Sequence, residues 1–176
     1  MKTKPVSAAA RSRTYARQVS LCGLLTALML VLGYLESMIP LAPSIPGIKL
    51  GLSNAVLLYA VYWLPVPVTF SLMLSKILLS ALLFPNPMAL AFSLAGGVAS
   101  TTGMLLGQRF GKFGIVGVSV LGAVLHNAGQ MIVAVHLVGN TSILYYGAIL
   151  TLAGILTGVL TGIVAGLVMK AVGNRW

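Results

Sequence analysis

A few polar and ionisable residues lie inside or beside the long apolar segments of this sequence, where such residues are costly and usually mark a functional site. Lys76 lies near the middle of one apolar segment. His126 and Gln130 lie in another and are four residues apart, so in a helix they share a face, with Asn127 on its flank. We therefore predict a polar pocket open to the outer face. Its predicted substrate-binding residues are Glu36, Lys49, Asn54, Lys76, His126, Asn127 and Gln130.

The charges of this predicted pocket indicate which ligands it prefers. Two lysines and two histidines, with His136 included, accompany a single acid, Glu36, so the pocket is net positive or neutral. We expect a ligand with a carboxylate, a phosphate or an electron-rich ring. Alternatives stay open: Lys76 could snorkel or pair with Glu36, and the His126 cluster could join helices by hydrogen bonds. Glu36 and Lys49 could be ordinary loop charges.

The segment 44–54 combines features that break a helix with features that bind an anion. A proline and a glycine interrupt the chain, and Gly51 and Asn54 stand at the start of the next apolar segment. A helix N-terminus that faces outward offers free N–H groups and the positive end of its dipole to an anion. We predict that Lys49 adds to this site and that the loop from Glu36 to Lys49 forms a lid. A plain outer turn is the alternative.

The composition excludes several kinds of chemistry. The chain has 176 residues, of which 7% are charged, against roughly 25% in soluble proteins. Lys and Arg number 11, whereas Glu36 is the single acid. Carboxylate pairs for acid–base catalysis and carboxylate cages for Mg²⁺ or Ca²⁺ are therefore excluded. The single cysteine, Cys22, excludes an internal disulfide and a thiolate zinc site. We expect no catalytic residue, no metal and no cofactor, and thus not an enzyme.

The elements that must position these residues are helices. Six apolar segments follow one another without the alternation of barrel strands, and only helices satisfy the backbone of an open-ended span in lipid. The segments are about Val19–Leu35, Leu50–Leu64, Val68–Phe84, Met88–Leu106, Ile115–Val138 and Tyr145–Val172. We predict an all-α integral membrane bundle of six transmembrane helices, although the second segment is short for a span of about 17–25 residues.

Basic residues indicate how the bundle is oriented. They concentrate in the first seventeen residues, in the loop with Arg109 and Lys112, and near the end with Lys170 and Arg175. Positive charge marks cytoplasmic loops, so we predict a multi-pass protein of the cell membrane with both termini inside; nucleic acid is not an expected partner. The predicted parts are a basic cytoplasmic tail 1–18, a six-helix transmembrane domain 19–172 and a cytoplasmic C-terminal tail 173–176. A signal peptide is the alternative for the N-terminus, although no clear small-x-small cleavage site is present.

Glycines recur at every fourth position in two of the predicted helices. They are Gly154, Gly158, Gly162 and Gly166 in the sixth segment, and Gly103, Gly107 and Gly111 in the fourth segment and its exit. Small residues on one helix face let helix backbones approach closely in lipid. We expect tight packing inside the bundle; a docking surface for another membrane subunit is the alternative.

Three motifs carry a resemblance to a known family. They are Pro46–Asn54 (PGIKLGLSN), Phe84–Met88 (FPNPM) and Ser93–Gly97 (SLAGG). From about residue 17 onward, the chain resembles the small membrane proteins described as heptaprenyl diphosphate synthase component I, also called the Gx transporter family. These proteins are in turn similar to the substrate-binding S components of energy-coupling-factor (ECF) transporters.

The two resemblances imply different functions. Similarity to S components implies a subunit that captures a small molecule and docks on a transmembrane coupling subunit driven by two ATPases. Small residues four apart in the first helix contact that subunit in such proteins, and Gly23 and Ala27 match this pattern. The synthase name implies a role in making the prenyl chain of menaquinone, but known synthases use aspartate-rich motifs, and this chain has no Asp. An S component-like subunit is our main expectation, and a non-catalytic membrane subunit of heptaprenyl diphosphate synthase is the alternative.

Overall fold

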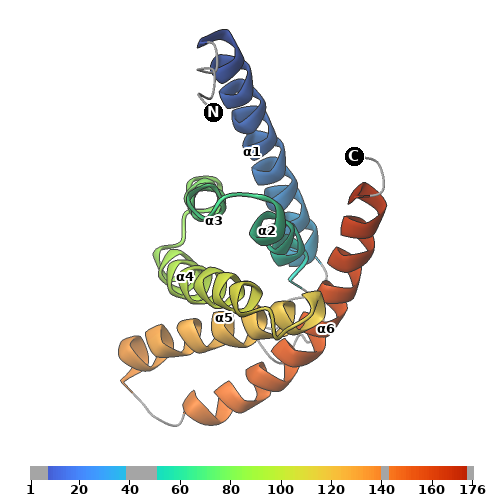
Figure 1. The fold of residues 1–176 in the computed structure, drawn as a ribbon. Helices are drawn as coiled ribbons and strands as arrows, with labels where there is room; N and C mark the ends of the chain where they lie inside the picture. Colours follow the sequence, from blue (N-terminus) through green and yellow to red (C-terminus); the bar gives the residue numbers. More distant parts are fainter. Residues whose placement is uncertain (1–7, 39–50, 140–142, 174–176) are drawn as a thin grey trace.

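The apolar segments form helices, because a helix satisfies its own backbone hydrogen bonds in lipid. The structure, a computed structural model, describes residues 8–38, 51–139 and 143–173. Within these residues it contains six α-helices and no strand (Figure 1). The helices are α1 Ala8–Ser37, α2 Leu52–Trp63, α3 Val66–Leu83, α4 Pro87–Phe110, α5 Ile115–Val138 and α6 Ile143–Gly173. The prediction of an all-α fold with six helices is confirmed.

Local sequence signals set several of the helix ends. α4 begins with Pro87 after Asn86, whose side-chain oxygen accepts a hydrogen bond from the Ala89 N–H at 3.1 Å. Proline suits the first helical position because an N–H there would lack a partner in the helix, and Asn is a favoured N-cap. α4 and α5 end at Gly111 and Gly139, whose φ angles are 64° and 65°. Glycine adopts this left-handed conformation readily, which is why it ends many helices.

Five of the described helices, all except α2, are long and apolar enough to cross a membrane. α2 has 12 residues. It is therefore about 18 Å long, less than the hydrocarbon core of about 30 Å. Gly51 precedes α2 in a left-handed conformation, and prolines at positions 65 and 67 follow it, so the sequence itself limits its length. The described chain thus has the form of a multi-pass membrane protein, with five helices of spanning length and one shorter helix.

α5 lies between α4 and α6, and these three helices make the most extensive contacts of the described structure. Figure 1 shows α4, α5 and the first half of α6 across the lower part of the view, while α1 rises away from them. α2 lies between α1 and α3 on one side and α4 and α6 on the other, since it contacts all four helices. α1 begins at Ala8, so its first turns belong to the segment 1–18 that we predicted as a tail.

The two rows of glycines, except Gly111, face α5. A Cβ atom on Gly158 would lie 2.9 Å from the Cα atom of Val120; on the other side, a Cβ atom on Gly129 of α5 itself would lie 2.6 Å from the carbonyl oxygen of Ala95 in α4. Only glycine allows helix backbones to approach this closely. Four other glycines of the rows also pack closely against α5: Gly103 and Gly107 of α4, and Gly154 and Gly162 of α6. Tight packing inside the bundle is therefore confirmed for these glycines, whereas Gly111 ends α4.

Polar side chains lie between the helices, while large apolar side chains face outward. Thr69 and Ser100 are at most 1% exposed, whereas Leu82 and Leu156 are 76% and 73% exposed. Lipid solvates an exposed leucine well, so a membrane bundle has no need to bury such residues and gains from placing polar groups inside. This distribution is the one expected of helices in a bilayer.

Candidate functional site

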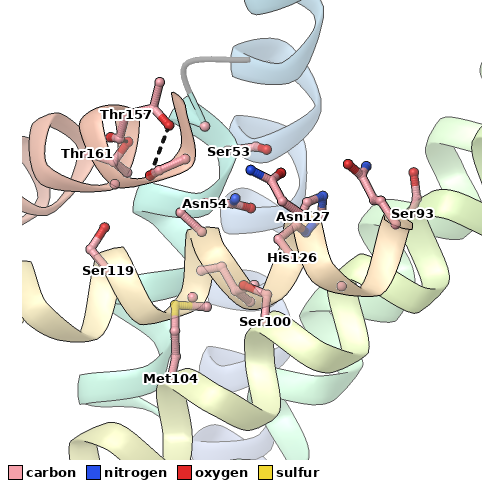
Figure 2. A pocket seen from close by; sticks show the side chains of 18 of the residues that line it. Ser53, Asn54, Ser93, Ser100, Met104, Ser119, His126, Asn127, Thr157 and Thr161 are labelled. Atoms are coloured by element: carbon pink, nitrogen blue, oxygen red, sulfur yellow. Dashed lines mark hydrogen bonds between the residues drawn. The ribbon is translucent and has the colours of Figure 1, made fainter. Parts of the chain in front are cut away.

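A cavity between the six helices gathers most of the residues that we predicted from the sequence. Its lining includes Glu36 of α1, Asn54 of α2, Lys76 of α3, and His126, Asn127 and Gln130 of α5. Figure 2 shows Asn54, His126 and Asn127 among the lining side chains. The cavity has a volume of about 110 Å³, which is smaller than the about 300–1,000 Å³ of typical small-molecule pockets and suits a small ligand. The fold thus brings six predicted residues to one place; that they bind a substrate stays a prediction.

One predicted residue and most of the predicted lid cannot be placed in this cavity. Lys49 lies outside the described residues, as does the lid segment 39–50. Their roles therefore stay predictions, and the described lining is that of the helices alone.

Glu36 links the end of α1 to the start of α2. Its side chain is 6% exposed, and its carboxylate accepts a hydrogen bond from the Gly51 N–H at 2.5 Å. Gly51 has a φ of 77°, a backbone conformation that favours glycine. A carboxylate is stabilised at a helix N-terminus by the free N–H groups and by the helix dipole. The helix start that we predicted as an anion site for a ligand therefore receives the chain's own carboxylate.

Asn127 joins α5 to α6 at the cavity wall. Its side-chain N–H donates a hydrogen bond to the carbonyl oxygen of Leu150 at 2.7 Å. Gly154 makes room for this amide, because a Cβ atom there would lie 2.6 Å from the Asn127 Nδ2 atom. For Asn127, the interhelical hydrogen bond that we considered as an alternative is therefore present, and the same residue also lines the cavity.

The two glycines of the Ser93–Gly97 motif set the spacing of α4 from its neighbours. A Cβ atom on Gly96 would lie 2.9 Å from the His126 ring, and one on Gly97 would lie 2.9 Å from the side chain of Ile77. A side chain at Gly96 would meet the His126 backbone oxygen at 2.9 Å and push α4 away from α5, whereas one at Gly97 would have to displace the flexible ends of the Ile77 and Met73 side chains of α3. The motif thus has a packing role beside the cavity.

Several polar side chains of the lining make no hydrogen bond to any part of the chain that the structure describes. They are Ser53, Asn54, Ser93, Ser100, Ser119 and Gln130. Ser100 is 1% exposed, and its hydroxyl oxygen has no partner among the described residues. Buried polar groups in proteins are nearly always hydrogen-bonded, if not to protein then to water or a ligand. These groups are therefore left for water or a ligand to pair with.

Our sequence reasoning did not find the hydroxyl residues of this lining. They are Ser53, Ser93, Ser100, Ser119, Thr157 and Thr161. Hydroxyl side chains are common in apolar helices because they can bond back to the preceding turn, as Thr161 does to the Thr157 carbonyl oxygen at 2.7 Å (Figure 2). A usable signal was the spacing in α4, where Ser93, Gly97 and Ser100 follow at intervals of four and three and so share one face.

The residues predicted to dock a partner lie elsewhere. Gly23 and Ala27 are both on an exposed face of α1, and a Cβ atom on Gly23 would have nothing within 4 Å. They do not line the cavity. Their accessible position is compatible with lipid or with another subunit, so the docking role stays a prediction. No three His, Cys, Asp or Glu side chains come together within the described ranges.

Comparison with known proteins identifies the family. The chain matches the family described as heptaprenyl diphosphate synthase component I over residues 25–168, a range that includes every residue of the cavity. The chain belongs to this family. No curated protein and no solved structure matches it.

Family membership bears on the two functions that we weighed. The resemblance carried by the three motifs is confirmed, and the family's name describes one component of a synthase. That name supports a synthase subunit, our alternative, better than the transport subunit that we preferred. It also implies a second synthase component as the partner, and it gives no support to the coupling subunit and ATPases that we expected.

Proposed function

We propose that the protein is a non-catalytic membrane subunit of a heptaprenyl diphosphate synthase and that it binds a small molecule between its helices. Membership of the component I family supports the synthase context. The lack of any Asp supports the non-catalytic role, because carboxylates are the usual ligands that hold Mg²⁺ on a diphosphate. A partner with an aspartate-rich motif supplies the catalysis.

The polar cavity is the observation that carries the binding role. A polar group without a partner is costly at membrane depth, yet Asn54, Gln130 and several serines line one space without partners in the described chain. A subunit that served only as a scaffold would be more stable with apolar side chains there. The cavity therefore favours a binding subunit over a purely structural one.

A synthesis assay tests the synthase context. Membranes from cells with and without this chain receive labelled isopentenyl diphosphate, and the labelled prenyl chains are separated by length. We expect the rate or length of synthesis to change on removal of the chain and to return with the wild-type protein. Gln130→Leu should restore it less well than Leu82→Ile, a control on an exposed side chain. Identical products with and without the chain would refute the proposal.

The cavity also favours a second candidate, a capture subunit of a transporter, because a ligand site without catalytic groups is what such a subunit needs. In that case Gly23 and Ala27 would contact a coupling subunit. Gly23→Leu would then abolish ATP-dependent uptake of the bound molecule while leaving its binding to the purified protein unchanged. Uptake that is equal in wild type and Gly23→Leu would reject this docking role.

The proposed location is the cell membrane, with both termini in the cytoplasm. The basic termini and the Arg109–Lys112 loop support this orientation. Fusions of alkaline phosphatase and of green fluorescent protein to the C-terminus test it, because the first is active only outside and the second fluoresces best inside. An active phosphatase fusion would reverse the proposed orientation.

A further inference from the structure

The charged side chains in the described lining are few and of opposite sign. Glu36 is an acid, Lys76 is a base and His126 is the one further ionisable group, and the described lining contains neither arginine nor aspartate. The Glu36 carboxylate already accepts the Gly51 N–H. A diphosphate carries more than one negative charge, and proteins hold such groups with bidentate arginines, several lysines or carboxylate-bound Mg²⁺. The described lining therefore does not suit a diphosphate.

Neutral hydrogen-bonding groups dominate the lining instead. The amides of Asn54 and Gln130 each present a donor and an acceptor side by side. The hydroxyl of Ser100 is almost fully buried, and none of its neighbours in the described chain pairs with it. An unpaired buried hydroxyl is unfavourable, and a ligand group that pairs with it removes that cost. The geometry thus calls for a ligand with several uncharged donors and acceptors.

Three methionines contribute to the apolar part of the same lining. Met29, Met73 and Met104 are 2%, 5% and 2% exposed, and they lie on three different helices. Thioether sulfur is polarisable and makes favourable contacts with aromatic rings. A flat ring with polar edges would satisfy both the methionines and the amides.

We propose that the cavity takes an uncharged planar ring with lactam-type donors and acceptors, and not a prenyl diphosphate, and that the Ser100 hydroxyl is one of its contacts. The proposal rests on the ligand-binding role given above and names the class of ligand. In the synthase complex, such a ligand would be a regulator or a partner-associated cofactor and not the prenyl substrate.

Binding to the purified protein in lipid nanodiscs tests the ligand class. The uncharged probes are uracil, hypoxanthine and lumichrome, which share a lactam edge and increase in size; the anionic probe is inorganic pyrophosphate. We expect at least one uncharged ring to bind and pyrophosphate not to bind at the same concentration. Binding of pyrophosphate alone, or of none of the four probes, would overturn this proposal. The prenyl-synthesis assay is independent of these probes, so the synthase role can stand if the ligand class fails.

A matched pair of variants tests the role of Ser100. Thr101 is its neighbour in sequence and is 0% exposed; its hydroxyl also lacks a partner among the described residues, but it is not part of the lining. Ser100→Ala and Thr101→Val each remove an unpaired buried hydroxyl, so both should unfold at the wild-type temperature or higher. Ser100→Ala should weaken binding of the uncharged probe by about three- to tenfold, the effect of one hydrogen bond, and Thr101→Val should leave it unchanged. Equal binding by wild type and Ser100→Ala, or equal weakening by both variants, would remove Ser100 from the site.

Discussion

Replacing Glu36, the chain's single acid, should destabilise the junction of α1 and α2. Its carboxylate is 6% exposed and accepts the Gly51 N–H at 2.5 Å. A hydrogen bond to a charged group contributes about 1.5–3 kcal/mol, and a charge at a helix N-terminus contributes up to about 2 kcal/mol in partly buried sites. These figures describe the same interaction and are not added. We therefore expect Glu36→Ala to lower the free energy of unfolding by about 2–3 kcal/mol. Glu36→Gln, which keeps an acceptor oxygen and loses the charge, should cost about half as much.

Reversible unfolding in mixed micelles with increasing mole fraction of dodecyl sulfate, followed by circular dichroism, measures this difference. Ser37→Ala is the matched control, because the neighbouring Ser37 hydroxyl donates an exposed bond to the Tyr34 carbonyl oxygen at 2.6 Å. Its loss should change stability by less than about 0.5 kcal/mol. The reasoning would be refuted if Glu36→Ala unfolded together with wild type, or if Glu36→Gln were as unstable as Glu36→Ala.

Substitutions at three further positions have expected outcomes in the same unfolding assay. Gly129→Ala should destabilise by about 2 kcal/mol or more, because its Cβ atom would lie 2.6 Å from the backbone oxygen of Ala95. Gly23→Ala should instead be neutral or stabilising by about 0.5–1 kcal/mol, because nothing lies within 4 Å of the new methyl group and alanine is the better helix former; the reverse order of these two variants would contradict the glycine packing. Asn86→Ala should cost about 1 kcal/mol through loss of the cap to the Ala89 N–H, whereas Asn86→Ser should retain most of the stability, and equal losses in both would exclude capping as the cause.

The helices could be predicted from the sequence because glycine, proline and asparagine residues mark several of their ends. The fifth predicted segment, Ile115–Val138, has the same bounds as α5, since glycines precede and follow it. The number of membrane-spanning helices was harder to predict from apolar runs. The second run, Leu50–Leu64, contains a helix of only 12 residues, because Gly51 adopts a left-handed conformation at its start. The glycine before α2 and the prolines after it therefore limit this helix, which mean hydropathy alone does not show.

The ionisable part of the cavity could be found in advance, whereas its hydroxyl part could not. Lys76 and His126 stand out because charges are rare in apolar helices, and both line the cavity. Ser100 does not stand out, because a hydroxyl in a helix usually satisfies itself on the preceding turn. The contact between Glu36 and Gly51 was also out of reach, because the residues are 15 apart and meet only when two helices pack. A hydrogen bond between residues of two different segments depends on how the helices pack, which the sequence of either segment alone does not show.

The glycines at the contacts of α5 with α4 and α6 should tolerate substitution less well than the hydroxyl residues that line the cavity. A larger residue at Gly129 or Gly158 would meet backbone atoms of a neighbouring helix and so disturb the whole three-helix unit of α4, α5 and α6. Ser93 also lines the cavity, and no glycine contact involves its side chain, so exchanging Ser93 for Ala should alter the cavity surface and leave the helix packing intact, whereas Ser119 packs against Gly162 and belongs with the glycines. The residues that set the helix packing and some of the residues that line the cavity are therefore different residues. Substitutions at cavity hydroxyls away from the glycine contacts, such as Ser93, are therefore the ones that would probe the proposed binding role without disturbing the fold.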